Sequence, residues 1–355
     1  MIKVLIAEDS LVMQQHLTHI LSSDPEIEIV GIANNGEEAI YAVEKLRPDV
    51  ITMDWHMPKL DGMQATRIIM ATNPTPIVIV TGSFKEKDVA FSFNMIEAGA
   101  LAIIKKPSSI VHPDYKNEIQ GLIQTLKLMS EIKLVKRISN IALEPISIKS
   151  EVPKIINKNS KAKIIAIGAS TGGPLIIQKI LSNMPKDIQV PILIVQHISI
   201  GFTKGFVQWL TNTTNFPLHI ACDGECLLPG NGYIAPDNFH MGIKNGAKIL
   251  LSNHELENGL RPSIAFLFRT VANVFGHEAI GVLLTGMGRD GAEELKLMKE
   301  KGAVTFAQDK ESCVVYGMPG EAEKLNAATY ILSPEEITKA LIGLTKKMNG
   351  DEYAK

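Results

Sequence analysis

Short apolar runs alternate with longer amphipathic stretches through the first third of the chain. The short runs are apolar at nearly every position, which is typical of strands buried on both faces of a parallel sheet. These strands are predicted at 2–7, 27–33, 50–53, 77–81 and 101–104. The stretches between them predict helices at 10–22, 36–46, 62–71 and 85–98, with a last helix from about residue 115. Five such units predict an α/β domain with a flavodoxin-like (βα)5 fold.

The same alternation resumes at residue 163 and continues towards the C-terminus. Buried strands are predicted at 164–168, 191–196, 279–285 and 304–308, and helices at 291–301 and near residue 320. Asn245-Gly246 lies between two apolar segments, a pattern that favours a tight β-hairpin. We therefore expect a second doubly wound, mostly parallel α/β domain with a β-hairpin.

The length of 355 residues exceeds what one hydrophobic core usually supports. We predict a first domain at 1–125, a linker at 126–162 and a second domain at 163–348. The linker segment, 126–162, is rich in lysine and contains no glycine. It is interpreted as a solvated linker, with a basic docking segment as the alternative.

The overall charge excludes some classes of protein. The chain has 36 Lys and Arg against 38 Asp and Glu, which argues against a dedicated nucleic-acid binder. The three cysteines, Cys222, Cys226 and Cys313, form no C-x-x-C pair and fit a reducing compartment. No apolar run approaches the roughly 20 residues of a membrane span. We expect a cytoplasmic protein without membrane insertion and without nucleic acid as partner.

Charged residues follow several strands of the first domain. Glu8 and Asp9 follow the first strand, and Asp54 follows the third. Ligands of open α/β sheets lie beyond the carboxyl ends of the strands, and clustered carboxylates select a hard cation such as Mg2+. Thr81 and Lys106 add a hydroxyl and a positive charge at two further strand ends. This set predicts phosphoryl transfer to an aspartate.

A glycine-rich turn follows the first strand of the second domain. Residues 168–172 match G-x-S-x-G, which presents Ser170 on a tight strand-to-helix turn. A phosphate or dinucleotide cradle is the alternative, although the G-x-G-x-x-G spacing is absent. His197 and Asp290 follow two other strands, so parallel neighbours would bring nucleophile, base and orienting carboxylate together. Alternatively, His197 is only a strand-end polar residue and Asp290 caps the helix that follows it.

Residues 1–120 resemble the response-regulator receiver family in the pair Glu8-Asp9, the segment MDWHMPKLDG, the VTG that ends at Gly82, and Lys106-Pro107. The resemblance implies that a histidine kinase of a chemotaxis system phosphorylates Asp54. It also implies Mg2+ at Asp9, Asp54 and the backbone carbonyl of His56, with Glu8 in support. Lys106 would contact the phosphoryl group and Thr81 would follow it. Ile103 replaces the Tyr or Phe whose rotamer changes in most receivers.

Residues 163–345 resemble the catalytic domain of the chemotaxis methylesterase (CheB) family in IGASTGGP, VQH, GFTKGF, LLPGNGYIAP, NGLRPS, VLLTGMGRDGA and AQDKESCVVYGMP. The resemblance implies that Ser170 attacks glutamyl γ-methyl esters of methylated chemoreceptors and releases methanol, and it suggests glutamine deamidation as well. His197 would act as base and Asp290 would orient it. Backbone N–H groups of Met287 and Thr171 would hold the oxyanion, and ester hydrolysis would need no cofactor.

The resemblance also implies how the two domains are coupled. The unphosphorylated receiver would block the active site, and phosphorylation would release it. The competing interpretations are a receiver-linked DNA-binding regulator and a nucleotide-binding domain. The near-neutral charge and the strands of the second domain disfavour the first of these.

Overall fold

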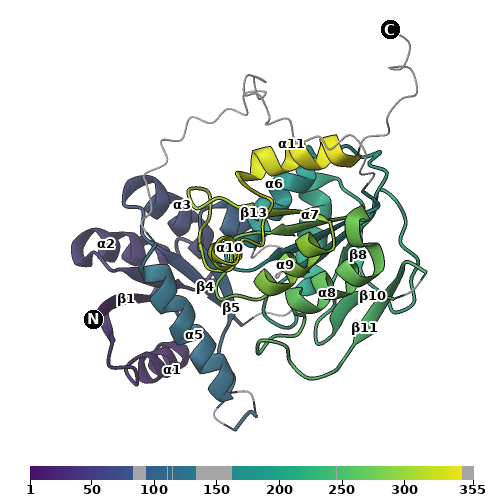
Figure 1. Ribbon diagram of the computed structural model, residues 1–355. Helices are drawn as coiled ribbons and strands as arrows, with labels where there is room; N and C mark the ends of the chain where they lie inside the picture. The colour runs from purple at the N-terminus through teal and green to yellow at the C-terminus, as the bar shows by residue number, and fades with distance from the viewer. Residues whose placement is uncertain (83–92, 110, 114, 133–161, 245, 346–355) are drawn as a thin grey trace. The chain divides into compact units, whose positions relative to one another are not determined.

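The computed structural model describes residues 1–82, 93–109, 111–113, 115–132, 162–244 and 246–345 (Figure 1). The chain divides into two compact units, Met1–Ser147 and Ile148–Lys355. Residues 133–161 of the predicted linker and 346–348 of the predicted second domain lie outside the described residues. The domain boundaries therefore stay predictions.

The first unit contains a five-stranded sheet in the order β2-β1-β3-β4-β5, with all pairs parallel. Its strands are β1 (Ile2–Ala7), β2 (Ile27–Ala33), β3 (Val50–Met53), β4 (Ile77–Thr81) and β5 (Ala102–Lys105). This is the strand order of flavodoxin-like folds, so the predicted class is confirmed. The buried apolar runs explain why sequence located these strands closely.

Helices cover both faces of this sheet. Helix α1 (Leu11–Leu21) lies beside α5 (Tyr115–Ser130), with His16 Nε2 3.3 Å from the hydroxyl of Tyr115. Helices α2 (Gly36–Leu46) and α3 (Gly62–Thr72) pack together. Most of the helix predicted at 85–98 lies outside the described residues, although 93–97 are helical.

Helix α5 continues past the predicted domain limit at residue 125. Leu126 and Met129 are fully buried in the first unit. The predicted linker start at 126 therefore falls inside a helix, because buried positions of α5 recur at helical spacing on both sides of residue 125.

The second unit is built on a seven-stranded parallel sheet in the order β14-β13-β12-β6-β7-β9-β8. Its strands are β6 (Ile164–Ala169), β7 (Ile192–Gln196), β8 (Leu218–Ile220), β9 (Gly232–Ile234), β12 (Ala279–Leu283), β13 (Val304–Gln308) and β14 (Tyr330–Leu332). The predicted hairpin is present as a separate pair, β10 (His240–Lys244) and β11 (Lys248–Ser252). The second fold prediction is thus confirmed too.

Two layers of helices enclose this sheet (Figure 1). One layer contains α6 (Gly173–Asn183), α7 (Thr203–Thr214) and α11 (Pro334–Thr345), and the other contains α8 (Ile264–Phe275), α9 (Ala292–Glu300) and α10 (Met318–Lys324). A 3-10 turn, η1 (Gly276–Glu278), follows α8. Loops follow the carboxyl ends of the strands, and this is the region where such folds bind their ligands.

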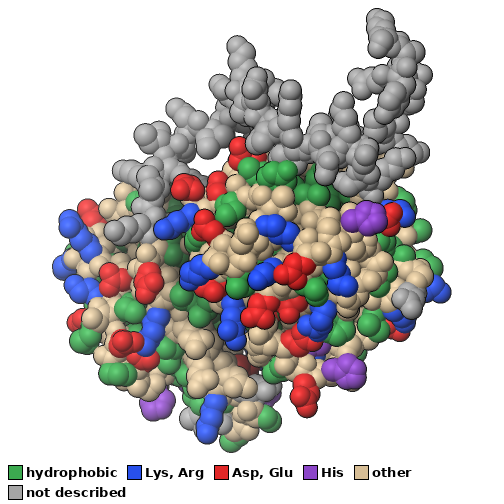
Figure 2. All heavy atoms as spheres, in the orientation of Figure 1, with side chains coloured by type: hydrophobic (Ala, Val, Ile, Leu, Met, Phe, Trp, Pro, Cys, Tyr) green, Lys and Arg blue, Asp and Glu red, His purple; other side chains and the backbone are tan. Residues whose placement is uncertain are grey.

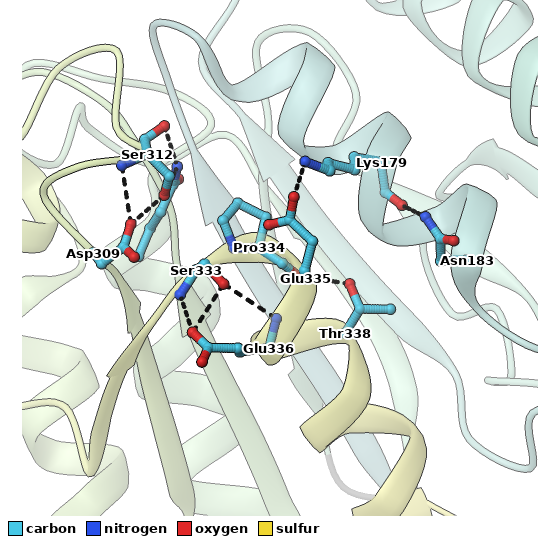
Figure 3. A network of polar contacts seen from close by, with 10 residues as sticks. Lys179, Asn183, Asp309, Ser312, Ser333, Pro334, Glu335, Glu336 and Thr338 are labelled. Atoms are coloured by element: carbon cyan, nitrogen blue, oxygen red, sulfur yellow. Dashed lines mark hydrogen bonds and ion pairs between the residues drawn. The ribbon is translucent and has the colours of Figure 1, made fainter. Parts of the chain in front are cut away.

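The start of α11 is fixed by local capping and by an ion pair (Figure 3). Ser333 and Glu336 form a capping box, in which the Glu336 carboxylate accepts from the Ser333 N–H at 3.0 Å. Glu335 pairs with Lys179 of α6 and joins the two helices. Nearby, Asp309 accepts a hydrogen bond from the Ser312 N–H at 3.0 Å and closes the turn after β13.

The surface shows no concentration of one sign of charge on the face in Figure 2, where Lys and Arg are interspersed with Asp and Glu. Among the described residues, every helix is too short or too polar to cross a lipid bilayer.

Candidate active site and phosphorylation site

The acidic cluster of the first unit gathers around Lys106. The Lys106 ammonium lies 2.8 Å from Asp54 Oδ2 and 2.7 Å from Glu8 Oε2. Glu8 is only 1% exposed and Asp54 6%, whereas Asp9 is exposed. Carboxylate oxygens of Glu8, Asp9 and Asp54 come within 4.8 Å of one another. Sequence therefore predicted correctly that these strand ends meet.

The charges in this cluster are unbalanced. Burial raises the pKa of Glu8 above its ordinary value of 4.5, and the Asp54 charge adds to this, although Lys106 opposes both. Burial alone would lower the pKa of Lys106, but hydrogen bonds and charges from Asp54 and Glu8 outweigh burial and raise it. Three carboxylates facing one ammonium fit a divalent cation, since oxygen ligands of this kind are those Mg2+ prefers.

This imbalance predicts that Glu8→Gln stabilises the metal-free protein. An acid whose pKa is raised in the fold loses stability as pH rises from about 4.5 to the folded pKa, so ionised Glu8 destabilises at pH 7. We expect the variant to melt a few degrees higher in EDTA and to gain less from Mg2+ than the wild type, measured by calorimetry. The exposed Glu28→Gln should behave as wild type. A lower melting temperature in EDTA would contradict the prediction.

The structure also describes Thr81 and His56, the other residues predicted for this site. The Lys106 N–H donates to the Thr81 carbonyl at 2.8 Å, which brings the ends of β4 and β5 together. Thr81 is buried. A Cβ on Gly82 would lie 3.3 Å from the Lys106 side chain, so the chain passes closely here. The His56 side chain is exposed, which suits a role limited to its backbone carbonyl.

In the second unit, Ser170 lies directly after β6 on a tight turn into α6. Gly172 adopts φ +78°, a conformation that favours glycine, and the Gly173 N–H donates to the Ser170 carbonyl at 2.8 Å. The Ser170 N–H donates to the Thr285 carbonyl at 3.0 Å, which ties the turn to the loop after β12. The Ser170 hydroxyl forms no hydrogen bond with another described group, and its side chain is partly exposed.

The three strands that precede the predicted triad are neighbours in the order β12-β6-β7. The prediction that Ser170, His197 and Asp290 meet at one sheet edge rested on this adjacency. His197 Nε2 lies 3.1 Å from Asp290 Oδ2. Within 162–244 and 246–345, Nδ1 of His197 forms no hydrogen bond, so one ring nitrogen is held and the other is available.

Asp290 is held by a helix that the sequence analysis did not locate. Its Oδ2 accepts from the Ile264 N–H at 2.6 Å, and its Oδ1 accepts from Ser263 Oγ at 2.9 Å and Asn258 Nδ2 at 2.8 Å. Asp290 thus caps α8, not the helix that follows it, which begins after Gly291. Burial would raise the pKa of Asp290, but His197 and these donors outweigh it and lower the pKa.

Two backbone N–H groups, of Thr171 and Met287, were predicted to hold the oxyanion. The N–H groups of Thr171 and Met287 donate to no acceptor among the described residues. Thr285 Oγ1 lies 3.0 Å from the Thr171 carbonyl and accepts from the Val315 N–H at 2.9 Å. A Cβ on Gly286 would overlap the Ser170 side chain, so the loop that carries Met287 passes against the serine. Thr285 was not among the site residues predicted from sequence.

A family model described as CheB methylesterase matches residues 165–341, and a model described as response regulator receiver domain matches residues 4–112. A protein of Nitrosospira multiformis named protein-glutamate methylesterase/protein-glutamine glutaminase is 53% identical over 345 residues, which cover 97% of each chain. The chain belongs to this methylesterase family. A relative of the same name, numbered 1, from Syntrophus aciditrophicus is 50% identical over 97% of this chain and 98% of its own.

The solved structures agree with this membership of the methylesterase family. The Thermotoga maritima CheB methylesterase catalytic domain is 39% identical, with a TM-score of 0.50, and covers 52% of this chain and 99% of its own. The function predicted from sequence, phosphorylation-regulated methyl ester hydrolysis in chemotactic adaptation, is confirmed at the level of the methylesterase family. The methylesterase interpretation of the second domain therefore replaces the nucleotide-binding and DNA-binding alternatives.

Proposed function

We propose that this chain hydrolyses glutamyl γ-methyl esters of chemoreceptors with Ser170 as nucleophile, His197 as general base and Asp290 as the group that orients the imidazole. The observation that carries the proposal is the His197–Asp290 pair, whose residues follow β7 and β12, the two strands that flank β6 and hence Ser170. Asp290 engages Nε2, so Nδ1 is the nitrogen left to take the serine proton.

The acyl-transfer chemistry follows the usual order for a serine hydrolase. Ser170 Oγ attacks the ester carbonyl while His197 removes its proton, and the same proton then passes to the departing methanol. The N–H groups of Met287 and Thr171 stabilise the oxyanion, and this assignment is supported by the absence of an acceptor for either group among the described residues. Water hydrolyses the acyl-enzyme. An amide leaving group would give the glutaminase activity that appears in the relatives' names.

Phosphorylation of Asp54 in the receiver regulates this ester hydrolysis. A histidine kinase of the chemotaxis system supplies the phosphoryl group, and Lys106 and Thr81 contact it. Glu8, Asp9, Asp54 and the His56 carbonyl would hold Mg2+, which offsets the negative charge gathered there. Phosphorylation opens access of methylated receptors to Ser170. The setting is the cytoplasm, and ester hydrolysis itself uses no cofactor.

The proposal is tested by methanol release from methylated chemoreceptors with and without a small phosphodonor. Wild type should be stimulated, whereas Asp54→Asn should keep its basal rate and show a stimulation ratio near one, because the acceptor carboxylate is gone. Asp49→Asn is a matched control, since this exposed carboxylate precedes β3 at the opposite end of the strand. Equal stimulation of Asp54→Asn and wild type would contradict the proposed regulation.

A further inference from the structure

Gln196 links the two loops that carry the proposed nucleophile and base. It is the last residue of β7, precedes His197 directly and is only 4% exposed. Its Nε2 donates to the Ser170 carbonyl at 2.8 Å and to the His197 carbonyl at 2.9 Å. The amide orientation is fixed by these acceptors, because a reversed amide would place its oxygen against two carbonyl oxygens.

This side chain continues the pairing of β6 and β7 beyond the backbone. The last ladder pair is Ala169 opposite Gln196, and the His197 N–H donates to the Ala169 carbonyl at 2.9 Å. After this bond the two chains diverge into their loops. The Gln196 amide then joins the next residue of each loop, so Ser170 and His197 are held at a defined separation.

The glycine-rich turn leaves room for this arrangement. A Cβ on Gly173 would overlap Gln196 Oε1, and Oε1 is buried without a hydrogen-bond partner among the described residues. Gly172 and Gly173 therefore serve different needs: Gly172 supplies a positive φ, and Gly173 supplies space for the glutamine. A buried unpaired oxygen is unfavourable, which indicates that the two bonds from Nε2 are worth retaining.

The geometry points to Gln196 as a positioning residue that sets the Ser170–His197 separation for the hydrolysis reaction. The inference rests on the proposed function and adds a residue outside the proposed triad. Gln196 acts through the two carbonyl oxygens that it binds.

Gln196→Met in the full-length protein tests the inference, since it keeps the volume and removes the donor. We expect kcat for methanol release to fall about 10²-fold with KM unchanged within about 3-fold, because small displacements of reacting groups have effects of this size. Labelling of Ser170 by a small fluorophosphonate should slow in parallel. A folded Gln196→Met variant with wild-type kcat and labelling rate would overturn the inference.

Thr214→Val controls for the loss of a buried hydrogen bond in general. Thr214 is buried at the end of α7, and its hydroxyl donates to the Leu210 carbonyl at 2.7 Å. We expect this variant to lower the melting temperature and leave kcat and the labelling rate unchanged. If both variants lost kcat in proportion to melting temperature, Gln196 would be merely structural and the inference would fail.

Gln196→Glu provides a second test with a pH readout, and it decides the matter if the methionine variant does not fold. The ionised carboxylate would face two carbonyl oxygens, while the protonated acid would donate to one of them. The ratio of variant to wild-type kcat should therefore rise as pH is lowered. A pH-independent ratio would overturn the inference. Full activity of Ser170→Ala would instead refute the proposed function itself.

Discussion

Ser170→Ala should lower kcat for methanol release by roughly 10⁴-fold or more, because it removes the hydroxyl that forms the acyl-enzyme in the proposed mechanism. The fold should be unaffected, since the serine hydroxyl bonds to no described group and the turn is fixed by backbone bonds to Thr285 and Gly173. The free energy of unfolding should therefore change by no more than about 0.5 kcal/mol, as is typical of substitutions at partly exposed positions. The measurement is methanol release together with a melting curve.

A neighbouring serine supplies the matched control for this substitution. Ser199 lies on the loop after His197, and its carbonyl accepts from the Phe202 N–H. Ser199→Ala leaves that backbone bond intact and should keep activity within about 3-fold of wild type. If Ser170→Ala remained as active as Ser199→Ala, the second domain would not be a serine hydrolase and the triad assignment would be wrong.

Asp290→Asn should have an effect of similar size, with kcat falling by about 10³ to 10⁴-fold. In the proposed mechanism the carboxylate orients His197 and fixes which ring nitrogen carries the proton, and an amide would do neither reliably. Asp290 also accepts from the N–H groups of Ile264 and Ala265 at the start of α8. An amide offers one acceptor and adds a donor facing donors, so we expect a loss of about 1–3 kcal/mol in unfolding free energy.

The pH dependence of this stability follows from the lowered pKa of Asp290. The ionised carboxylate contributes fully above the unfolded value of about 3.9, and this contribution is lost as pH falls through the lower folded pKa. Wild type should therefore exceed Asp290→Asn in stability at neutral pH, and the difference should shrink in acid. Denaturant unfolding at several pH values measures this difference, and a constant one would contradict the prediction.

Ser263→Ala separates the two roles of Asp290. It removes one hydrogen bond to Oδ1 and leaves the contact of Oδ2 with His197 intact. We expect a modest loss of stability and less than about a 10-fold loss of kcat. Equal effects of Ser263→Ala and Asp290→Asn on kcat would mean that Asp290 acts only as a helix cap.

Buried strands explain why so much of the fold could be predicted. Strands such as β1 and β13 have the limits expected from sequence, because each is a short apolar run enclosed on both faces. Helix α8 was not predicted. Its segment, IAFLFRTVANVF, nevertheless has a helical pattern, since the buried residues Ile264, Leu267, Phe268 and Val271 recur at helical spacing.

In the candidate site, residues marked by local sequence signals were predicted, whereas contacts between distant segments were not. Glycines and strand ends locate Ser170 and His197, since these signals lie within a few residues of each side chain. The partners of Asp290 come from a helix and a loop distant in sequence, and no spacing encodes that meeting. Asn258 and Ser263 belong to the segment NGLRPS, which was recognised without any role for its residues.

The capping of α8 by Asp290 makes two backbone amides into reporters of the active site. The N–H groups of Ile264 and Ala265 donate to this carboxylate, so we expect their hydrogen exchange to speed up when the carboxylate stops accepting from them. A change in charge on the His197–Asp290 pair should therefore alter these hydrogen bonds at the first turn of α8. Exchange rates at these amides should therefore report the average charge state of the His197–Asp290 pair without any probe in the substrate pocket.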